Sequence, residues 1–202
     1  MTQVTPGWLA EAISGRSDGL GNLAVARIAS GETLGKGRLS LSSAAFAPGA
    51  ELDPCFTADE EDAVAPPLEW TAPPPGTQEM VLIVEDADGK AGDNADDPTC
   101  HWLVWGLPGQ KGQLLEGETP PRVGKNSQRN SEWLLPAPAH GDTAHRYVFQ
   151  LFALDLPLTL MPGIDRATLV AAIEGHIMAA AVLVGTYKRA EPEESWVEDD
   201  DA

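Results

Sequence analysis

Carboxylate and imidazole groups stand at the ends of apolar runs, where strands would present them at the rim of a sheet. Asp86 and Asp88 follow one apolar run, and His101 opens the next. His145 opens a third run, two positions before Tyr147. Imidazole and phenol groups donate hydrogen bonds to an anion, and a carboxylate orients an imidazole or accepts from a protonated group. Together these residues predict a polar pocket for a small anion.

The apolar runs that position these groups are predicted to be β-strands, over residues 80–84, 101–105 and 148–154. Successive side chains of a strand point to opposite faces of its sheet. Alternation therefore places Asp86 and Asp88 on one face. It places His101 on the face of Leu103 and Trp105.

The third run opens with His145-Arg146-Tyr147. Alternation turns the imidazole and the phenol to one side and Arg146 to the other. Because His101 and His145 each begin a strand, we expect them to meet at one rim of the sheet.

The charge of the chain excludes one class of partner. Its 202 residues include 13 Lys and Arg against 31 Asp and Glu, a formal net charge of −18 at pH 7. Nucleic-acid binding depends on Lys and Arg that neutralise phosphates. We therefore expect no nucleic-acid partner. Any bound anion must be held by a local pocket that overcomes the repulsion from the net negative charge of the protein.

The sequence also predicts a location. No apolar run approaches the roughly 20 residues of a membrane span, and no signal-peptide pattern opens the chain. Cys55 and Cys100 are expected to be free thiols, as in a reducing compartment, with Cys100 facing away from the pocket. We predict a cytoplasmic protein without an integral membrane segment.

One domain is predicted over residues 38–189, with a segment of different composition on each side. Residues 1–37 are expected to be an N-terminal extension of short helices or partly ordered chain. The extension would pack on the domain or on a partner subunit, and the second arrangement would make the protein a homodimer. Residues 190–202 carry seven acids and few apolar groups, as is typical of an acidic disordered tail.

Within the domain, one helix is predicted to begin after Asp165 as its N-cap and to continue with apolar spacing as far as Ala181. A strand over 182–187 would follow. The segment 109–142 is rich in turn formers, and a loop of that length is usually functional. The acidic loop 86–97 fails the EF-hand pattern at Ala91, where glycine is required, so no metal is expected.

Eight motifs in order resemble the phosphatidylethanolamine-binding proteins, in particular their bacterial Raf-kinase-inhibitor-like branch. The resemblance covers roughly residues 39–189. The motifs are Ala65-Pro66-Pro67-Leu68-Glu69-Trp70, Asp86-Ala87-Asp88, His101-Trp102, Gly124-Lys125-Asn126-Ser127, Pro136-Ala137-Pro138-Ala139-His140-Gly141, His145-Arg146-Tyr147, Ala153-Leu154-Asp155 and Gly185-Thr186-Tyr187.

This resemblance implies a mainly β fold, an antiparallel β-sandwich with a few peripheral helices, and a small anion pocket at one sheet rim. By position, it places the ligand-binding residues of that pocket at Asp86, Asp88, His101, Pro138, His145 and Tyr147. The chain departs from the family pattern at Ala87 and Lys90, which replace prolines, and at Leu135, which replaces a glycine.

Two classes of function fit these residues. The first is a non-enzymatic binder of a small anion of the phosphate or phosphoethanolamine type, with a regulatory or inhibitory role toward a protein partner that the sequence does not identify. The alternatives are a hydrolase that uses the same His and Asp side chains, or a protease or kinase inhibitor that acts through surface loops. No nucleophile-elbow serine supports a hydrolase. We expect neither catalytic residues nor a cofactor.

Overall fold

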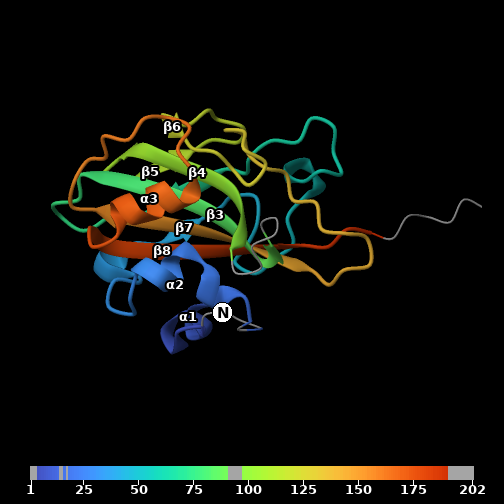
Figure 1. Ribbon diagram of the computed structural model, residues 1–202, viewed down its shortest axis with the longest axis horizontal. Helices are drawn as coiled ribbons and strands as arrows, with labels where there is room; N and C mark the ends of the chain where they lie inside the picture. The colour runs from blue at the N-terminus through green and yellow to red at the C-terminus, as the bar shows by residue number, and fades with distance from the viewer. Residues whose placement is uncertain (1–3, 14–15, 17, 91–96, 191–202) are drawn as a thin grey trace, which may run out of the picture.

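The computed structural model, described for residues 4–13, 16, 18–90 and 97–190, is built on an antiparallel sheet of five strands. The strand order is β6-β4-β3-β7-β8 (Figure 1). Each predicted strand over 80–84, 101–105 and 148–154 lies within one of these strands and is confirmed. The strands are β3 (Glu79–Lys90), β4 (Pro98–Pro108), β6 (Arg122–Val123), β7 (His145–Leu154) and β8 (Ile177–Tyr187).

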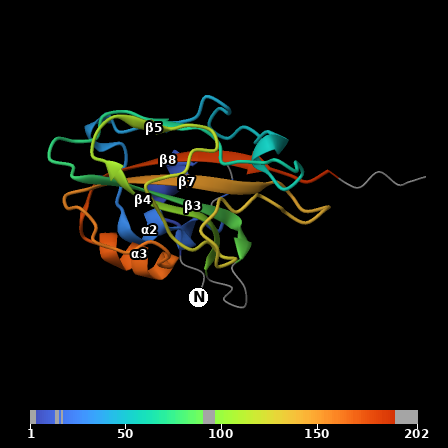
Figure 2. The ribbon, with the colours of Figure 1, turned by 90° about the horizontal axis from the view of Figure 1, so that it is seen from above.

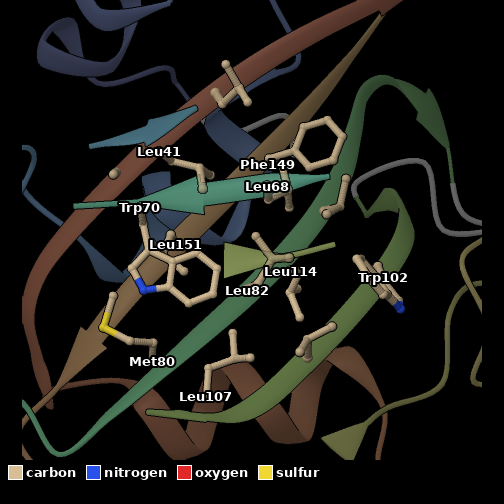
Figure 3. Close-up of a cluster of buried hydrophobic side chains, with 14 of the residues drawn as sticks. Leu41, Leu68, Trp70, Met80, Leu82, Trp102, Leu107, Leu114, Phe149 and Leu151 are labelled. Carbon is tan, nitrogen blue, oxygen red and sulfur yellow. The ribbon is translucent and has the colours of Figure 1, made fainter. Parts of the chain in front are cut away.

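A smaller sheet of order β1-β2-β5 packs on one face of the large sheet. It contains β1 (Leu41–Ser42), β2 (Leu68–Trp70) and β5 (Gly112–Leu114). Apolar side chains from both sheets fill the space between them, among them Trp70, Trp102 and Phe149 (Figure 3). Burial of these large side chains stabilises the two-sheet arrangement. The predicted antiparallel β-sandwich is confirmed.

Helices cover the opposite face of the large sheet (Figure 2). They are α1 (Gly7–Ala12), α2 (Ala24–Ile28) and α3 (Arg166–Ile173). The chain also forms single 3₁₀ turns at Leu20–Asn22, Lys36–Arg38 and Pro54–Phe56, which do not all lie on this face. A second apolar cluster, which includes Leu23, Val81 and Leu169, lies between these helices and the sheet. Because both faces are buried, the central parts of the long strands are mostly apolar on both faces.

The described residues between positions 4 and 29 are called the N-terminal segment below. Leu9, Leu23 and Val25 of this segment are fully buried in the second apolar cluster. The segment therefore packs on the large sheet of its own chain.

A β-bulge at His101 changes the faces that simple alternation predicts. The register between β3 and β4 shifts there, so that His101 has no residue opposite it. The rings of both His101 and Trp102 contact Trp133 on one side of the sheet. Leu103 lies in the cluster on the other side. The prediction that His101 shares a face with Leu103 is therefore wrong.

A second irregularity falls at the end of β3. Asp86 pairs with Thr99, but the next paired residue of β3 is Lys90, opposite Pro98. The unpaired residues between them turn the two carboxylates apart: Asp86 bonds His145, whereas Asp88 bonds Arg146. The prediction that Asp86 and Asp88 share one face is wrong, because strand alternation does not continue through the bulge.

The helix α3 begins as predicted, since the side chain of Asp165 accepts a hydrogen bond from the Thr168 N–H at 2.9 Å. It ends at Ile173 instead of continuing to Ala181. Gly175 has φ +82°, which ends the helix and lets the chain return as β8. The apolar residues after Gly175 belong to a strand buried on both faces. Their spacing also fits a helix, which is why the sequence predicted a longer one.

The outer edge of β8 is covered by two segments of the chain, one before β1 and one between β1 and β2. Gly35 N donates to Ala180 O at 2.8 Å, and Ala180 N donates to Thr33 O at 2.9 Å. Farther along the strand, Leu52 N donates to Thr186 O at 2.7 Å. Two short parallel bridges thus occupy backbone groups of β8 that β7 does not use.

Three further predictions concern the two cysteines, a membrane span and the C-terminal tail. The thiols of Cys55 and Cys100 are free, and Cys100 lies in the cluster on the face away from the His101 ring. None of the helices in the described part of the chain has the length and apolar character that a membrane span requires. The predicted acidic tail falls outside the described residues, except for Ala190.

Candidate functional site

A pocket of about 270 Å³ opens at the sheet rim where β3 ends and β7 begins, on the face of the small sheet. We call it the rim pocket. Drug-sized ligands occupy cavities of roughly 300–1,000 Å³, so this one suits a small ligand. Its lining residues are Asp86, Gly89, Lys90, Thr99, His101, Gln128, Leu134, Leu135, Ala137, Pro138, Ala139, His145 and Tyr147.

Asp86 and His145 form the charged pair of the rim pocket. His145 Nδ1 donates to Asp86 Oδ2 at 2.7 Å, and Asp86 Oδ1 accepts the backbone N–H groups of Asp88 and Gly89 at 2.8 and 2.9 Å. The hydrogen bond to Asp86 raises the pKa of His145 above its ordinary value, against the effect of partial burial. Asp142 adds a second carboxylate, with its Oδ2 3.6 Å from His145 Nε2. His145 is therefore the imidazole of the pocket whose charged form is stabilised.

His101 has the opposite character. Burial lowers its pKa, so the ring is neutral near pH 7. Its Nδ1 lies 2.6 Å from the carbonyl oxygen of Leu134, and because a carbonyl can only accept, Nδ1 carries the proton. Nε2 is then an acceptor, and it has no hydrogen-bond partner among the described residues.

Tyr147 supplies a neutral donor beside the two histidines. Its ring packs edge-on against that of His101, with centroids 5.1 Å apart. The side chain is 1% exposed, and burial raises the pKa of its hydroxyl, which stays protonated. The pocket thus combines a cation, a hydroxyl donor and a neutral nitrogen acceptor.

The structure brings five of the six predicted ligand-binding residues into the rim pocket: Asp86, His101, Pro138, His145 and Tyr147. Asp88 does not line it. The Asp88 carboxylate instead accepts hydrogen bonds from the backbone N–H and the guanidinium of Arg146. The family resemblance had placed Asp88 in the pocket by position, and strand alternation, which does not continue through the bulge, had agreed with it.

Sequence reasoning missed several polar lining residues, including Lys90, Thr99 and Gln128. Strand spacing gave no usable signal for Lys90 or Thr99, because a register irregularity separates Lys90 from Asp86 and another separates Thr99 from the rest of β4. Gln128 directly follows the motif 124–127. Leu135, which replaces a glycine of the family pattern, forms part of the wall of the pocket.

A larger groove of about 940 Å³ lies on the opposite face, between α3 and the loop 124–129. Arg166 in its wall is paired with Glu85 and lies 3.8 Å from Asp97. Its lining contains no histidine, whereas the rim pocket brings together two imidazoles, a phenol and a carboxylate. The rim pocket is the better candidate, because imidazole is the side chain whose charge ordinarily changes near neutral pH.

Gly89→Ala is expected to weaken the Asp86–His145 pair. A Cβ at position 89 would lie 2.5 Å from Asp86 Oδ2 and 2.9 Å from Thr99 Oγ1, so the carboxylate must move away from the imidazole. The pKa of His145 should fall toward about 6.5, its ordinary value. An NMR titration of the imidazole protons measures this. Gly7→Ala is the control, since nothing lies within 4 Å of its added Cβ; equal His145 titration in both variants would contradict the expectation.

The comparisons with known proteins agree on one family. The family model for phosphatidylethanolamine-binding protein matches residues 42–188. A UPF0098 protein from Aquifex aeolicus is 34% identical over 158 residues, which cover 75% of this chain and 89% of that relative. LppC from Mycobacterium tuberculosis, which is named as a lipoprotein, is 34% identical over 154 residues, covering 74% of this chain and 72% of the relative.

Solved structures give the same result. A phosphatidylethanolamine-binding protein homologue from Chlamydia trachomatis has a TM-score of 0.69 and 32% identity, and the match covers 75% of this chain and 97% of that one. YbcL from E. coli, at 20% identity and a TM-score of 0.66, supports the fold alone; that match covers 75% of this chain and 98% of YbcL. The family predicted from the order of eight motifs is confirmed: the chain belongs to the phosphatidylethanolamine-binding protein family.

Proposed function

We propose that the protein binds a small anion of the phosphate or phosphoethanolamine type in the rim pocket, without turnover. The observation that carries the proposal is the convergence of the His145 cation and the Tyr147 hydroxyl on one small pocket. Both groups donate hydrogen bonds, and a bond from a charged donor to an anion is roughly twice as strong as a neutral one. Lys90 adds a second cation to the same wall.

The neutral His101 gives the proposed site a further requirement. Its Nε2 can only accept, so the ligand must offer a hydrogen-bond donor as well as anionic oxygens. A monoprotonated phosphate carries both, and so does phosphoethanolamine through its ammonium group. Sulfate carries no donor near pH 7 and would place an oxygen lone pair against that of Nε2.

Binding without covalent catalysis is favoured by the composition of the wall. The residues that line the rim pocket include neither serine nor cysteine. The thiol of Cys100 lies on the other face of β4, and Ser127 lines the groove beside α3. A serine or cysteine nucleophile for the hydrolase alternative is therefore missing from the described lining.

Titration with phosphate and with sulfate at pH ~6.5 tests the proposal. Phosphate is expected to bind about tenfold more tightly, because sulfate offers no donor to the His101 Nε2 acceptor while shielding it from water, at a cost of about 1–3 kcal/mol. Calorimetry measures strong binding, and chemical-shift changes of the His101 and His145 ring protons report weak binding. Absence of phosphate binding at millimolar concentration would remove the proposed function, and release of phosphate from added phosphoethanolamine would favour a hydrolase.

We also propose a cytoplasmic location and a regulatory role exerted on a protein partner. The free thiols of Cys55 and Cys100 support a reducing compartment. Cell fractionation with thiol labelling tests the location, and recovery of the protein in a membrane fraction, as the name of the LppC relative suggests for that protein, would overturn it.

A further inference from the structure

The corner of the sheet that carries the rim pocket has a second, opposite side. Asp86 and His145 face the pocket, whereas Asp88 and Arg146, two positions and one position farther along the same strands, face the N-terminal segment. Because the same short pieces of backbone carry both pairs, a displacement on one side is transmitted to the other.

Arg146 connects the sheet to the N-terminal segment. It is 6% exposed, and its Nε and Nη2 donate to the Asp88 carboxylate at 2.9 and 2.8 Å. Nη1 donates to the backbone carbonyl of Arg16, and Nη2 also donates to the carbonyl of Asp18 at 2.7 Å. The guanidinium of Arg16 adds a bond of 2.6 Å to Asp88. The segment therefore satisfies donors of a buried guanidinium that the sheet alone leaves unpaired.

Gly19 brings the backbone of the segment directly onto β3. It has φ +78°, and a Cβ at this position would lie 2.0 Å from the carbonyl oxygen of Ala87. Ala87 stands between Asp86 and Asp88, so the contact falls at the bulge behind the pocket. Only a residue without a side chain permits this approach.

Farther along, buried hydrogen bonds hold the segment in place. Ala24 N donates to Glu85 Oε2 at 2.8 Å, and Val25 N donates to Gln150 Oε1 at 2.7 Å. Arg166, which is paired with Glu85, donates to the carbonyl of Asn22 at 3.0 Å. These contacts anchor the segment at the strand residue that precedes Asp86.

We infer that the N-terminal segment is a positioning element of the rim pocket, which acts on Asp86 and His145 through Asp88 and Arg146. The route is short. Asp86 Oδ1 accepts the backbone N–H groups of Asp88 and Gly89, and Asp86 Oδ2 accepts from His145, so the imidazole is oriented by backbone that Arg146 and Gly19 hold. The match to the family model begins at residue 42, so it does not include the N-terminal segment. The effect on ligand binding rests on the proposed function, but the effect on His145 does not.

The experiment compares Gly19→Ala with Gly35→Ala in the full chain. Both glycines have positive φ, of +78° and +67°, so both substitutions strain the backbone. At Gly35 nothing lies within 4 Å of the added Cβ, whereas at Gly19 the Ala87 carbonyl must move. Arg146→Lys is a third variant, which keeps the charge but loses the fork that joins Asp88 to the two segment carbonyls.

The pKa of His145, measured by NMR without ligand, is the first readout. The charged groups facing His145 are Asp86 on β3 and Asp142 in the preceding loop, with Asp88, Lys90 and neutral His101 near them. Gly19→Ala and Arg146→Lys are expected to lower the pKa, because Asp86 is displaced, and Gly35→Ala to leave it unchanged. Phosphate affinity should fall about fivefold or more in the first two variants only.

An unchanged His145 titration in folded Gly19→Ala and Arg146→Lys protein would overturn the inference. Equal shifts in Gly19→Ala and Gly35→Ala would overturn it too, since general destabilisation would then explain them; urea denaturation of each variant gives that comparison. If wild-type protein fails to bind phosphate, the proposed function fails, and the ligand-free titration of His145 still decides the inference.

Discussion

Arg166→Met is expected to lower the free energy of unfolding by about 3–5 kcal/mol, because it leaves a buried carboxylate without its partner. The Glu85 side chain is fully buried, and that of Arg166 is 13% exposed. Glu85 also accepts hydrogen bonds from Ala24 N and Gln150 Nε2, both at 2.8 Å, which do not neutralise its charge. Urea denaturation followed by tryptophan fluorescence measures the loss.

Two further variants show whether the unpaired charge is the cause. Glu85→Gln combined with Arg166→Met should recover part of the lost stability, since a neutral amide at position 85 costs less to bury than a carboxylate. Arg189→Met breaks a more exposed pair with Asp59, whose side chains are 26% and 29% accessible, and should cost less than about 1 kcal/mol. A loss for Arg166→Met no greater than that for Arg189→Met would contradict the expectation.

His145→Ala is expected to weaken anion binding by about tenfold or more at pH ~6 and to remove its dependence on pH. A hydrogen bond from a charged group contributes about 1.5–3 kcal/mol, which corresponds to that factor. Asp86 raises the pKa of His145, so the imidazole is charged below about pH 6.5 and loses its proton at higher pH. Since an anion prefers the charged form, affinity in the wild-type protein should fall as pH rises through that raised pKa.

Sulfate is the suitable probe for this pH series, because its charge does not change between pH ~6 and pH ~9, whereas phosphate titrates near pH ~6 to 7. Burial lowers the pKa of His101, so its ring is neutral in the part of this series above about pH 6.5. His140→Ala is the matched control: that exposed ring bonds the carbonyl of Ala190 outside the pocket. Affinities that do not vary with pH in the wild-type protein, or that vary equally in His145→Ala, would argue against His145 as the binding cation.

The strands were predictable because their apolar runs are long and their polar residues stand at the ends. Met80 to Val84 pairs with both neighbouring strands, and His145 and Tyr147 share a face as alternation requires. The bulge at His101 was not predictable. In a sheet buried on both faces, apolar residues occupy both sides, so a one-residue shift leaves no trace in the hydrophobic pattern.

The polar groups that hold the N-terminal segment could not be predicted for another reason. Glu85, Gln150 and Arg166 meet from three elements that are distant along the chain, and no local periodicity marks such a meeting. Asp88 shows the limit most clearly. A motif and its strand position assigned Asp88 to the pocket. Only the three-dimensional course of β3 shows that its carboxylate accepts hydrogen bonds from Arg146 instead.

The hydrogen bonds on the outer edge of β8 have a consequence for self-association. An unpaired edge strand offers its backbone to a strand of another molecule, which is the usual route to sheet-to-sheet aggregation. Here the backbone groups of Ala180 and Thr186 are already bonded to Thr33, Gly35, Ala50 and Leu52 of the same chain. A second copy cannot add a strand to the sheet at these positions, so the edge of β8 is protected there from strand-to-strand aggregation.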